Sequence, residues 1–187
     1  MFLITKLPNL LTLLRIGAVP VLILFLRERE YAIAVAIFVG AGITDGLDGW
    51  IAKKFNCVTR LGSILDPIAD KVLIVSTYVM LVLLGDLPFW LLLLIVFRDV
   101  GIIGGYLILD TLHGSVPLRP SLLSKVNTVL QIILVSVVLI DRAGWVHLPW
   151  LNELLIGLVG LTTLISGIHY VYLWFIRGAE YDDTVGS

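Results

Sequence analysis

The chain alternates between long apolar runs and short polar breaks. Each run is close to the roughly 20 residues that an α-helix needs to cross the hydrocarbon core of a bilayer. The runs cover about Asn9–Leu26, Tyr31–Ala52, Leu61–Leu84, Phe89–Asp110, Leu122–Ile140 and Trp150–Ile176. We therefore predict an all-α, polytopic membrane protein with six transmembrane helices, organised as one domain over residues 1–187. A short N-terminal juxtamembrane segment (residues 1–8) precedes the helices, and a short acidic tail begins at Arg177.

The composition supports a membrane protein. Of the 187 residues, 59% are hydrophobic and only 14% are charged, whereas about a quarter of a typical soluble domain is charged. The net charge of −1 gives no reason to expect a nucleic-acid partner. The single cysteine, Cys57, excludes a disulfide within the chain.

Basic residues between the apolar runs predict the orientation. Six helices place both chain ends on one side of the membrane, and basic residues favour the cytoplasmic side. One side carries Lys6, Lys53, Lys54, Arg60, Arg119 and Arg177, and the other carries Arg27, Arg29 and Arg142. We therefore expect the first side to face the cytoplasm, as in a protein of the bacterial cytoplasmic (inner) membrane.

Four aspartates lie where the second run ends and the third begins. Asp45 and Asp48 are three residues apart, and Asp66 and Asp70 are four apart. On a helix either spacing puts both carboxylates on one face. Charged groups inside a membrane helix each cost about 2.5–3.5 kcal/mol, so four of them indicate a functional site near the predicted cytoplasmic face.

Divalent metal is the expected counter-ion for these carboxylates. Oxygen ligands suit Mg²⁺, Mn²⁺ or Ca²⁺ better than zinc, and Mg²⁺ commonly shares its coordination shell with substrate phosphates. Glycines beside the aspartates, Gly49 and Gly62, would let a phosphate or a nucleoside approach the backbone. Phosphoryl-transfer chemistry beside a membrane is the favoured interpretation. The alternatives are a cation or proton transport pathway, carboxylates that only support packing, and a scaffold without activity.

The same stretch resembles the signature of the CDP-alcohol phosphatidyltransferases, D-x2-D-G-x2-A-R-x8-G-x3-D-x3-D. Here it reads Asp45, Asp48, Gly49, Ala52, Lys53, Gly62, Asp66 and Asp70, with every spacing kept. Lys53 replaces the family's arginine, which keeps the charge but loses bidentate binding of phosphate. The predicted layout of six helices also resembles that family.

The resemblance implies a role for each signature residue. Asp45, Asp48, Asp66 and Asp70 would bind two divalent cations, Mg²⁺ or Mn²⁺, and Asp70 would also act as the general base. Asp48, Gly49, Ala52, Lys53 and Gly62 would form the CDP site, to which we assign Asn9 and Thr12 as well. The substrates would be CDP-diacylglycerol and an acceptor lipid or glycerol 3-phosphate, and the protein would be a homodimer.

Three further stretches bear on the acceptor. Residues 8–15 (PNLLTLLR) are similar to the opening shared by phosphatidylglycerophosphate synthases and eukaryotic-type cardiolipin synthases, while residues 97–100 (FRDV) and 120–131 (PSLLSKVNTVLQ) look more like the latter. Polar residues recur at helical spacing along the fifth run, and Arg98 is a cation within the fourth. We assign the acceptor site to Arg98, Lys125, Asn127, Gln131 and Arg60. The alternatives for these groups are hydrogen bonds between helices and, for Arg98, an ion pair with one of the four aspartates. Asp99 is expected to point elsewhere on the helical wheel and to be a structural residue.

Two acceptors remain open at this point. Phosphatidylglycerol would give cardiolipin, and glycerol 3-phosphate, a dianion, would need more cationic groups than the helices provide. We favour phosphatidylglycerol, with phosphatidylglycerophosphate synthesis as the alternative. None of the three histidines has a lysine two positions later, which excludes the H-x-K phosphohydrolase mechanism of other cardiolipin synthases. Gly101 and Gly105 are expected to serve close helix packing, either within the bundle or in a dimer, and we favour the bundle.

Overall fold

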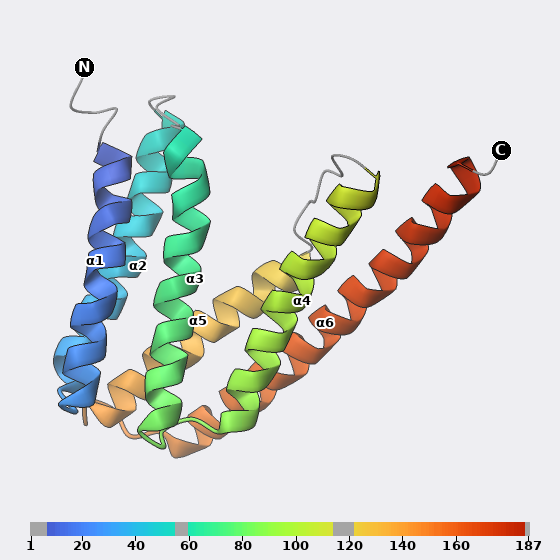
Figure 1. Cartoon of the computed structure of the whole chain (residues 1–187). Coiled ribbons are helices and arrows are strands. Elements are labelled where there is room, and N and C mark those ends of the chain that lie inside the picture. Colours follow the sequence, from blue (N-terminus) through green and yellow to red (C-terminus); the bar gives the residue numbers. More distant parts are fainter. Residues whose placement is uncertain (1–6, 55–59, 114–121, 186–187) are drawn as a thin grey trace. The chain divides into compact units, whose positions relative to one another are not determined.

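The computed structural model describes the backbone of residues 7–54, 60–113 and 122–185, and the side chains of residues 12–46, 68–105, 111 and 122–172. These residues form six α-helices and no strand (Figure 1). The helices are α1 (Leu7–Arg27), α2 (Tyr31–Lys54), α3 (Arg60–Leu83), α4 (Phe89–His113), α5 (Leu122–Arg142) and α6 (Pro149–Val185). The prediction of an all-α chain with six helices in these places is confirmed.

The prediction was wrong about the last helix. We expected the sixth helix to end near Ile176 and an acidic tail to follow, but α6 continues through Arg177 to Val185. This stretch contains no proline, and its glycine, Gly178, is followed by good helix formers such as Ala179 and Glu180. A change from apolar to polar residues therefore marks the end of the apolar run, not the end of the helix.

Three helices end with the same hydrogen-bonded turn. After α3, Gly85 N–H donates to the carbonyl of Val82 (3.1 Å) and Asp86 N–H donates to that of Leu81 (2.8 Å). This is a Schellman motif, in which the residue after the helix adopts a left-handed conformation. The motif recurs with Gly144 after α5 and with Arg29 after α1. The φ angles are 81° at Gly85, 74° at Gly144 and 60° at Arg29, the one non-glycine residue with positive φ in the described part.

The described residues form two compact units. The first contains residues up to Leu87 together with Val135–Pro149, and the second contains Pro88–Leu134 together with the chain from Trp150 onward. In the first unit α1 packs against both α2 and α3. Its core contains the fully buried side chains Leu22, Leu26, Ala34, Tyr78 and Leu81.

The second unit contains α4, α6 and the first part of α5. Its core includes Leu91, Ile95 and Val159, all fully buried. A Cβ atom added at Gly160 of α6 would lie 2.9 Å from the ring of Trp90 on α4, so α4 and α6 approach closely at this glycine. The α5 helix contributes residues to both units, because the division falls between Leu134 and Val135.

Two helices of the described part are long and apolar enough to cross a membrane, judged by length and composition. They are Leu122–Arg142 and the Pro149–Tyr172 portion of α6. Membrane crossing by the other four helices stays a prediction.

Candidate active site

The first unit contains an arginine bound to two of the predicted aspartates. Arg15 of α1 places its Nη1 atom 2.8 Å from Oδ1 of Asp45 on α2 and 2.7 Å from Oδ1 of Asp70 on α3. The arginine side chain is only 1% exposed, whereas each aspartate side chain is 40% exposed. Side chains from three helices therefore meet at one cationic nitrogen, and the carboxylates remain accessible.

Local sequence explains why Arg15 points inward. Thr12 and Arg15 are three residues apart on α1, so they share one helical face, and both are buried. That face lies among α2 and α3, since α1 packs on both. Because a buried charge is costly unless it is paired, the inward arginine needs carboxylate partners. Asp45 and Asp70 meet this need, and Ala69, fully buried beside Asp70, fits the close packing of α3.

Several predicted site residues lie outside the described side chains. The backbone places Asp48, Gly49, Ala52 and Lys53 in α2, Arg60, Gly62 and Asp66 in α3, and Asn9 in α1. Among the described side chains, no group of three or more acidic, histidine or cysteine residues is positioned to hold a metal ion. The predicted four-aspartate cluster is thus described only through Asp45 and Asp70.

The described pair nevertheless fits a divalent cation. Carboxylate oxygens from two different helices converge on one positively charged atom, which shows that the backbone can bring both to a common cation. Oxygen donors of this kind suit Mg²⁺ and Mn²⁺.

A second polar cluster surrounds Arg98 in the second unit. Its Nη1 atom lies 2.7 Å from Oδ1 of Asp99. Nη2 donates to the hydroxyls of Ser124 on α5 and Ser166 on α6, the latter at 3.0 Å, and Nε also donates to Ser166 at 3.3 Å. The guanidinium thereby links α4, α5 and α6.

Asp99 forms an ion pair with Arg98 in which both side chains are buried, although the helical wheel directs the two residues differently. A wheel describes the direction of the Cα–Cβ bond, whereas the long arginine side chain can bend back to a neighbour on its own helix. The alternative, an ion pair between Arg98 and an aspartate of the predicted cluster, stays a prediction.

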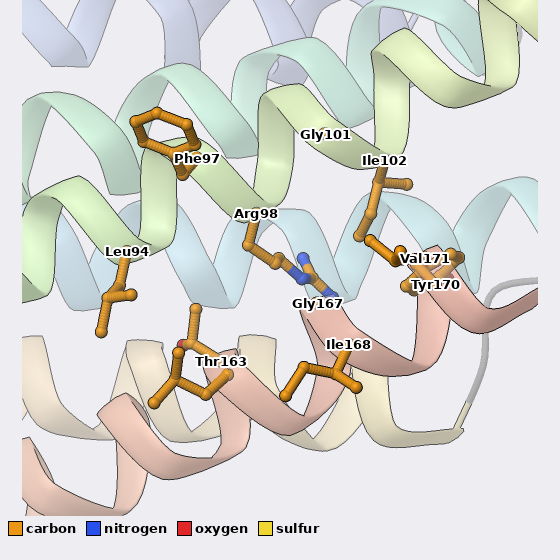
Figure 2. Close-up of a pocket in the computed structure, with 11 residues that line it drawn as sticks. Leu94, Phe97, Arg98, Gly101, Ile102, Thr163, Gly167, Ile168, Tyr170 and Val171 are labelled. Carbon is orange, nitrogen blue, oxygen red and sulfur yellow. The ribbon is translucent and has the colours of Figure 1, made fainter. Parts of the chain in front are cut away.

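An apolar cavity of about 360 Å³ lies beside Arg98. Figure 2 shows its lining, with Leu94, Phe97, Arg98 and Ile102 on α4 opposite Thr163, Ile168 and Val171 on α6. Gly101 also lines it, and a Cβ added there would meet nothing within 4 Å. The spacing of Gly101 suggested a tight contact between helices. In the described part, however, Gly101 borders open space.

Three other predicted acceptor residues, Lys125, Asn127 and Gln131, lie along α5. Asn127 is fully buried, and its Oδ1 accepts hydrogen bonds from Thr162 (2.8 Å) and Thr163 (3.0 Å) of α6. Gln131 is also fully buried, one turn further along. Lys125 is exposed. Arg98 thus bonds to Ser124 of α5, and Asn127 bonds to α6. Lys125 takes part in neither contact.

Arg15 and Ser166 had no predicted role in a site. A signal was present for Arg15, because it shares a polar face with Asn9 and Thr12, and a charged residue within a membrane segment is functional by default. Ser166 lies in an apolar helix with several other hydroxyl residues, and nothing in its spacing distinguishes it from them.

The described residues are thus helical throughout each element, and accessible carboxylates from two helices meet at a buried arginine. Residues 5–175 match the model of the CDP-alcohol phosphatidyltransferase family, and the chain belongs to this family. The resemblance noted in the sequence is thereby confirmed.

Curated relatives carry two different activities. The chain is 37% identical over 170 residues to the CDP-diacylglycerol–glycerol-3-phosphate 3-phosphatidyltransferase of Rickettsia bellii, covering 88% of this chain and 93% of the relative. It is 35% identical over 174 residues to a probable phosphatidylglycerophosphate synthase of Mycobacterium tuberculosis, covering 90% and 81%. It is 40% identical over 145 residues to the CMP-forming cardiolipin synthase of Rattus norvegicus, covering 69% of this chain and 48% of the relative.

Family membership makes this chain a transferase of phospholipid biosynthesis, and the family generally uses divalent metal ions. Its substrates are a CDP-alcohol and an acceptor that is a lipid or a glycerol phosphate.

Proposed function

We propose that this protein transfers the phosphatidyl group of CDP-diacylglycerol to phosphatidylglycerol, which yields cardiolipin and CMP. The observation that carries the proposal is the meeting of Asp45 and Asp70 at Arg15, because it brings together carboxylates from both halves of the family signature.

Each aspartate has a role in the proposed reaction. Asp45, Asp48, Asp66 and Asp70 would hold two divalent cations, Mg²⁺ or Mn²⁺, and these would supply positive charge to neutralise the diphosphate and the departing phosphate. Asp70 takes the proton from the acceptor hydroxyl as general base. The acceptor oxygen then attacks the phosphorus attached to the lipid, the bond to the CMP oxygen breaks, and CMP leaves.

The CDP end of the donor is proposed to bind beside these carboxylates. The residues assigned to it are Asp48, Gly49, Ala52, Lys53, Gly62, Asn9 and Thr12. Thr12 supports this assignment because it lies one turn before Arg15 on the same buried face of α1. Lys53 would contact phosphate through a single ammonium where most of the family uses arginine.

The charge of the Arg98 cluster favours a lipid acceptor. Arg98 is paired with Asp99, so the pair carries no net charge, and its other described partners are neutral serines. A phosphodiester such as phosphatidylglycerol brings one negative charge, whereas glycerol 3-phosphate brings nearly two. We therefore assign acceptor binding to Arg98 with Asn127 and Gln131, and we retain Lys125 and Arg60 as predicted acceptor residues.

Phosphatidylglycerophosphate synthesis is the second candidate. The rickettsial relative that carries this activity in its name matches over 93% of its length, whereas the rat cardiolipin synthase matches over 48%. The match over nearly the full length of the rickettsial relative favours glycerol 3-phosphate as the acceptor. The charge of the Arg98 cluster favours phosphatidylglycerol.

We further propose that all six helices cross a bacterial cytoplasmic membrane, with the aspartates at the cytoplasmic face, and that the protein is a homodimer. The apolar runs and the distribution of basic residues support the first part. Family resemblance alone supports the dimer.

One assay tests the proposal and chooses between the acceptors. Purified protein in detergent receives CDP-diacylglycerol and Mg²⁺ or Mn²⁺, with either phosphatidylglycerol or glycerol 3-phosphate, and mass spectrometry identifies the products. We expect cardiolipin and CMP, and we expect activity to disappear with EDTA or in Asp70→Ala but to persist in Glu153→Ala, an exposed acidic control. Phosphatidylglycerophosphate as the sole product would replace our proposal by the alternative. Full activity of Asp70→Ala would refute the mechanism.

A further inference from the structure

We infer that Arg15 is a positioning residue that holds the metal-binding aspartates of α2 and α3 in register from inside the protein. This inference rests on the proposed function, because it assigns Asp45 and Asp70 to metal binding.

The contacts fix two helices against one atom. The Oδ1 atoms of Asp45 and Asp70 both contact the Nη1 atom of Arg15. The distance between these two oxygens therefore cannot exceed the sum of the two contact distances. Asp45 and Asp70 are 25 positions apart in the chain and sit on different helices. A shift of α2 along α3 would therefore lengthen at least one bond to Arg15.

Burial separates the arginine from the side that a ligand would use. The Arg15 side chain is 1% exposed, and the two carboxylates are 40% exposed. A cation or a phosphate can thus reach the carboxylates while Arg15 remains behind them. This arrangement distinguishes a positioning group from a group that contacts substrate.

The charges are also suited to that role. Two carboxylates held this close repel each other. One guanidinium reduces this repulsion and leaves the three side chains with a net charge of −1, which still attracts a cation. Thr12, on the same face, is neutral and cannot replace it.

A matched control exists in the same unit. Arg142 pairs with Asp86 through Nε at 2.8 Å, and its side chain is 48% exposed. Arg142→Gln removes an arginine–aspartate pair without touching Asp45 or Asp70. A general loosening of the unit would affect both variants, whereas a positioning role is specific to Arg15.

The experiment measures metal binding first, without lipid substrate. Mn²⁺ is titrated into full-length protein in detergent and free Mn²⁺ is followed by EPR, for wild type, Arg15→Gln, Arg15→Lys and Arg142→Gln. Loss of a group that orients metal ligands typically reduces affinity by about 10–100-fold. We expect a loss of that size in Arg15→Gln, a smaller loss in Arg15→Lys, and wild-type affinity in Arg142→Gln.

Turnover then separates positioning from binding of the donor. CMP release should show a lower kcat in Arg15→Gln with little change in KM for CDP-diacylglycerol, and Arg15→Lys should recover part of kcat. Wild-type Mn²⁺ affinity in Arg15→Gln, or an equal loss in Arg142→Gln, would overturn the inference. If Arg15→Gln does not fold, wild-type affinity and kcat in Arg15→Lys would overturn it.

The two proposals fail in different ways. Wild-type protein that binds Mn²⁺ but releases no CMP contradicts the proposed function and leaves the positioning role supported by the binding data. Wild-type protein that binds no Mn²⁺ refutes the positioning role.

Discussion

The phenolic hydroxyl of Tyr31 donates a hydrogen bond of 2.8 Å to Oδ2 of Asp86, 55 positions later in the chain. Tyr31 begins α2, and Asp86 lies in the turn after α3. The other oxygen of Asp86, Oδ1, accepts from Arg142 at the end of α5. The Asp86 side chain is only 6% exposed, so one buried carboxylate ties together three elements of the first unit.

Replacing Tyr31 with phenylalanine should therefore destabilise the protein. Hydrogen bonds to charged groups contribute about 1.5–3 kcal/mol, and we expect the lower end because Asp86 keeps Arg142 as a partner. The free energy of unfolding, measured by denaturant titration in detergent, should fall by about 1.5 kcal/mol. Tyr172→Phe is the control, since Tyr172 is exposed. Equal stability of the two variants would contradict the prediction.

Substitutions at Arg29 and Gly85, which occupy equivalent positions after two helices, should change the stability in opposite directions. Both follow a helix in the left-handed conformation, which costs a side-chain-bearing residue about 1–2 kcal/mol. Arg29→Gly should raise the free energy of unfolding by about 0.5–1 kcal/mol, because part of the gain is offset by the entropy of glycine in the unfolded chain. Gly85→Ala should lower it by about 1 kcal/mol. Changes of the same sign in both variants would be inconsistent with this account.

Gly160 and Gly157, one turn apart on α6, should respond differently to alanine. A Cβ at Gly160 would meet the Trp90 ring at 2.9 Å, whereas at Gly157 it would meet nothing within 4 Å. Gly160→Ala should destabilise the protein by about 1–3 kcal/mol through overpacking, and Gly157→Ala should stabilise it by about 0.5 kcal/mol. Because Trp90 is half-exposed, Trp90→Leu should abolish the cost at Gly160. Persistence of that cost in the double variant would refute the proposed clash.

Arg98 requires a variant that separates stability from acceptor binding. Arg98→Met alone removes one member of the buried Arg98–Asp99 ion pair, which typically costs about 3–5 kcal/mol. Arg98→Met combined with Asp99→Asn removes both charges and should recover most of that loss. In this double variant we expect the KM for phosphatidylglycerol to rise about tenfold or more, the loss of one charged contact, with the KM for CDP-diacylglycerol unchanged. Unchanged KM values for both would make Arg98 a structural link only.

The helices were predictable because each depends on local sequence. Apolar runs of membrane length, separated by charged or glycine-containing breaks, indicate helices whatever they pack against. The final turns of α6 were missed because the apolar run ends near Ile176, whereas the mostly polar residues from Arg177 to Val185 are still compatible with a helix.

The site was predictable only in part, because partners depend on how helices meet. Spacing placed Asp45 and Asp70 on helical faces, but no local pattern specifies that Arg15, 30 positions before Asp45, lies between them. The pairing of Arg98 with Asp99 was missed for a different reason, the reach of a long side chain. Asp48 and Asp66 remain predictions based on the signature.

The outer surface of α1 offers a position for a spectroscopic reporter. Gly17 is exposed, lines a shallow groove with Leu14 and Ile37, and would meet nothing within 4 Å if it carried a Cβ. The chain has a single cysteine, so Gly17→Cys in a Cys57→Ser background would accept one spin label or fluorophore. That label would sit two residues from Arg15 without touching its partners. Its signal would report changes near the aspartates in real time, during ligand binding and turnover. The label itself would lie on the face of α1 that points away from those aspartates.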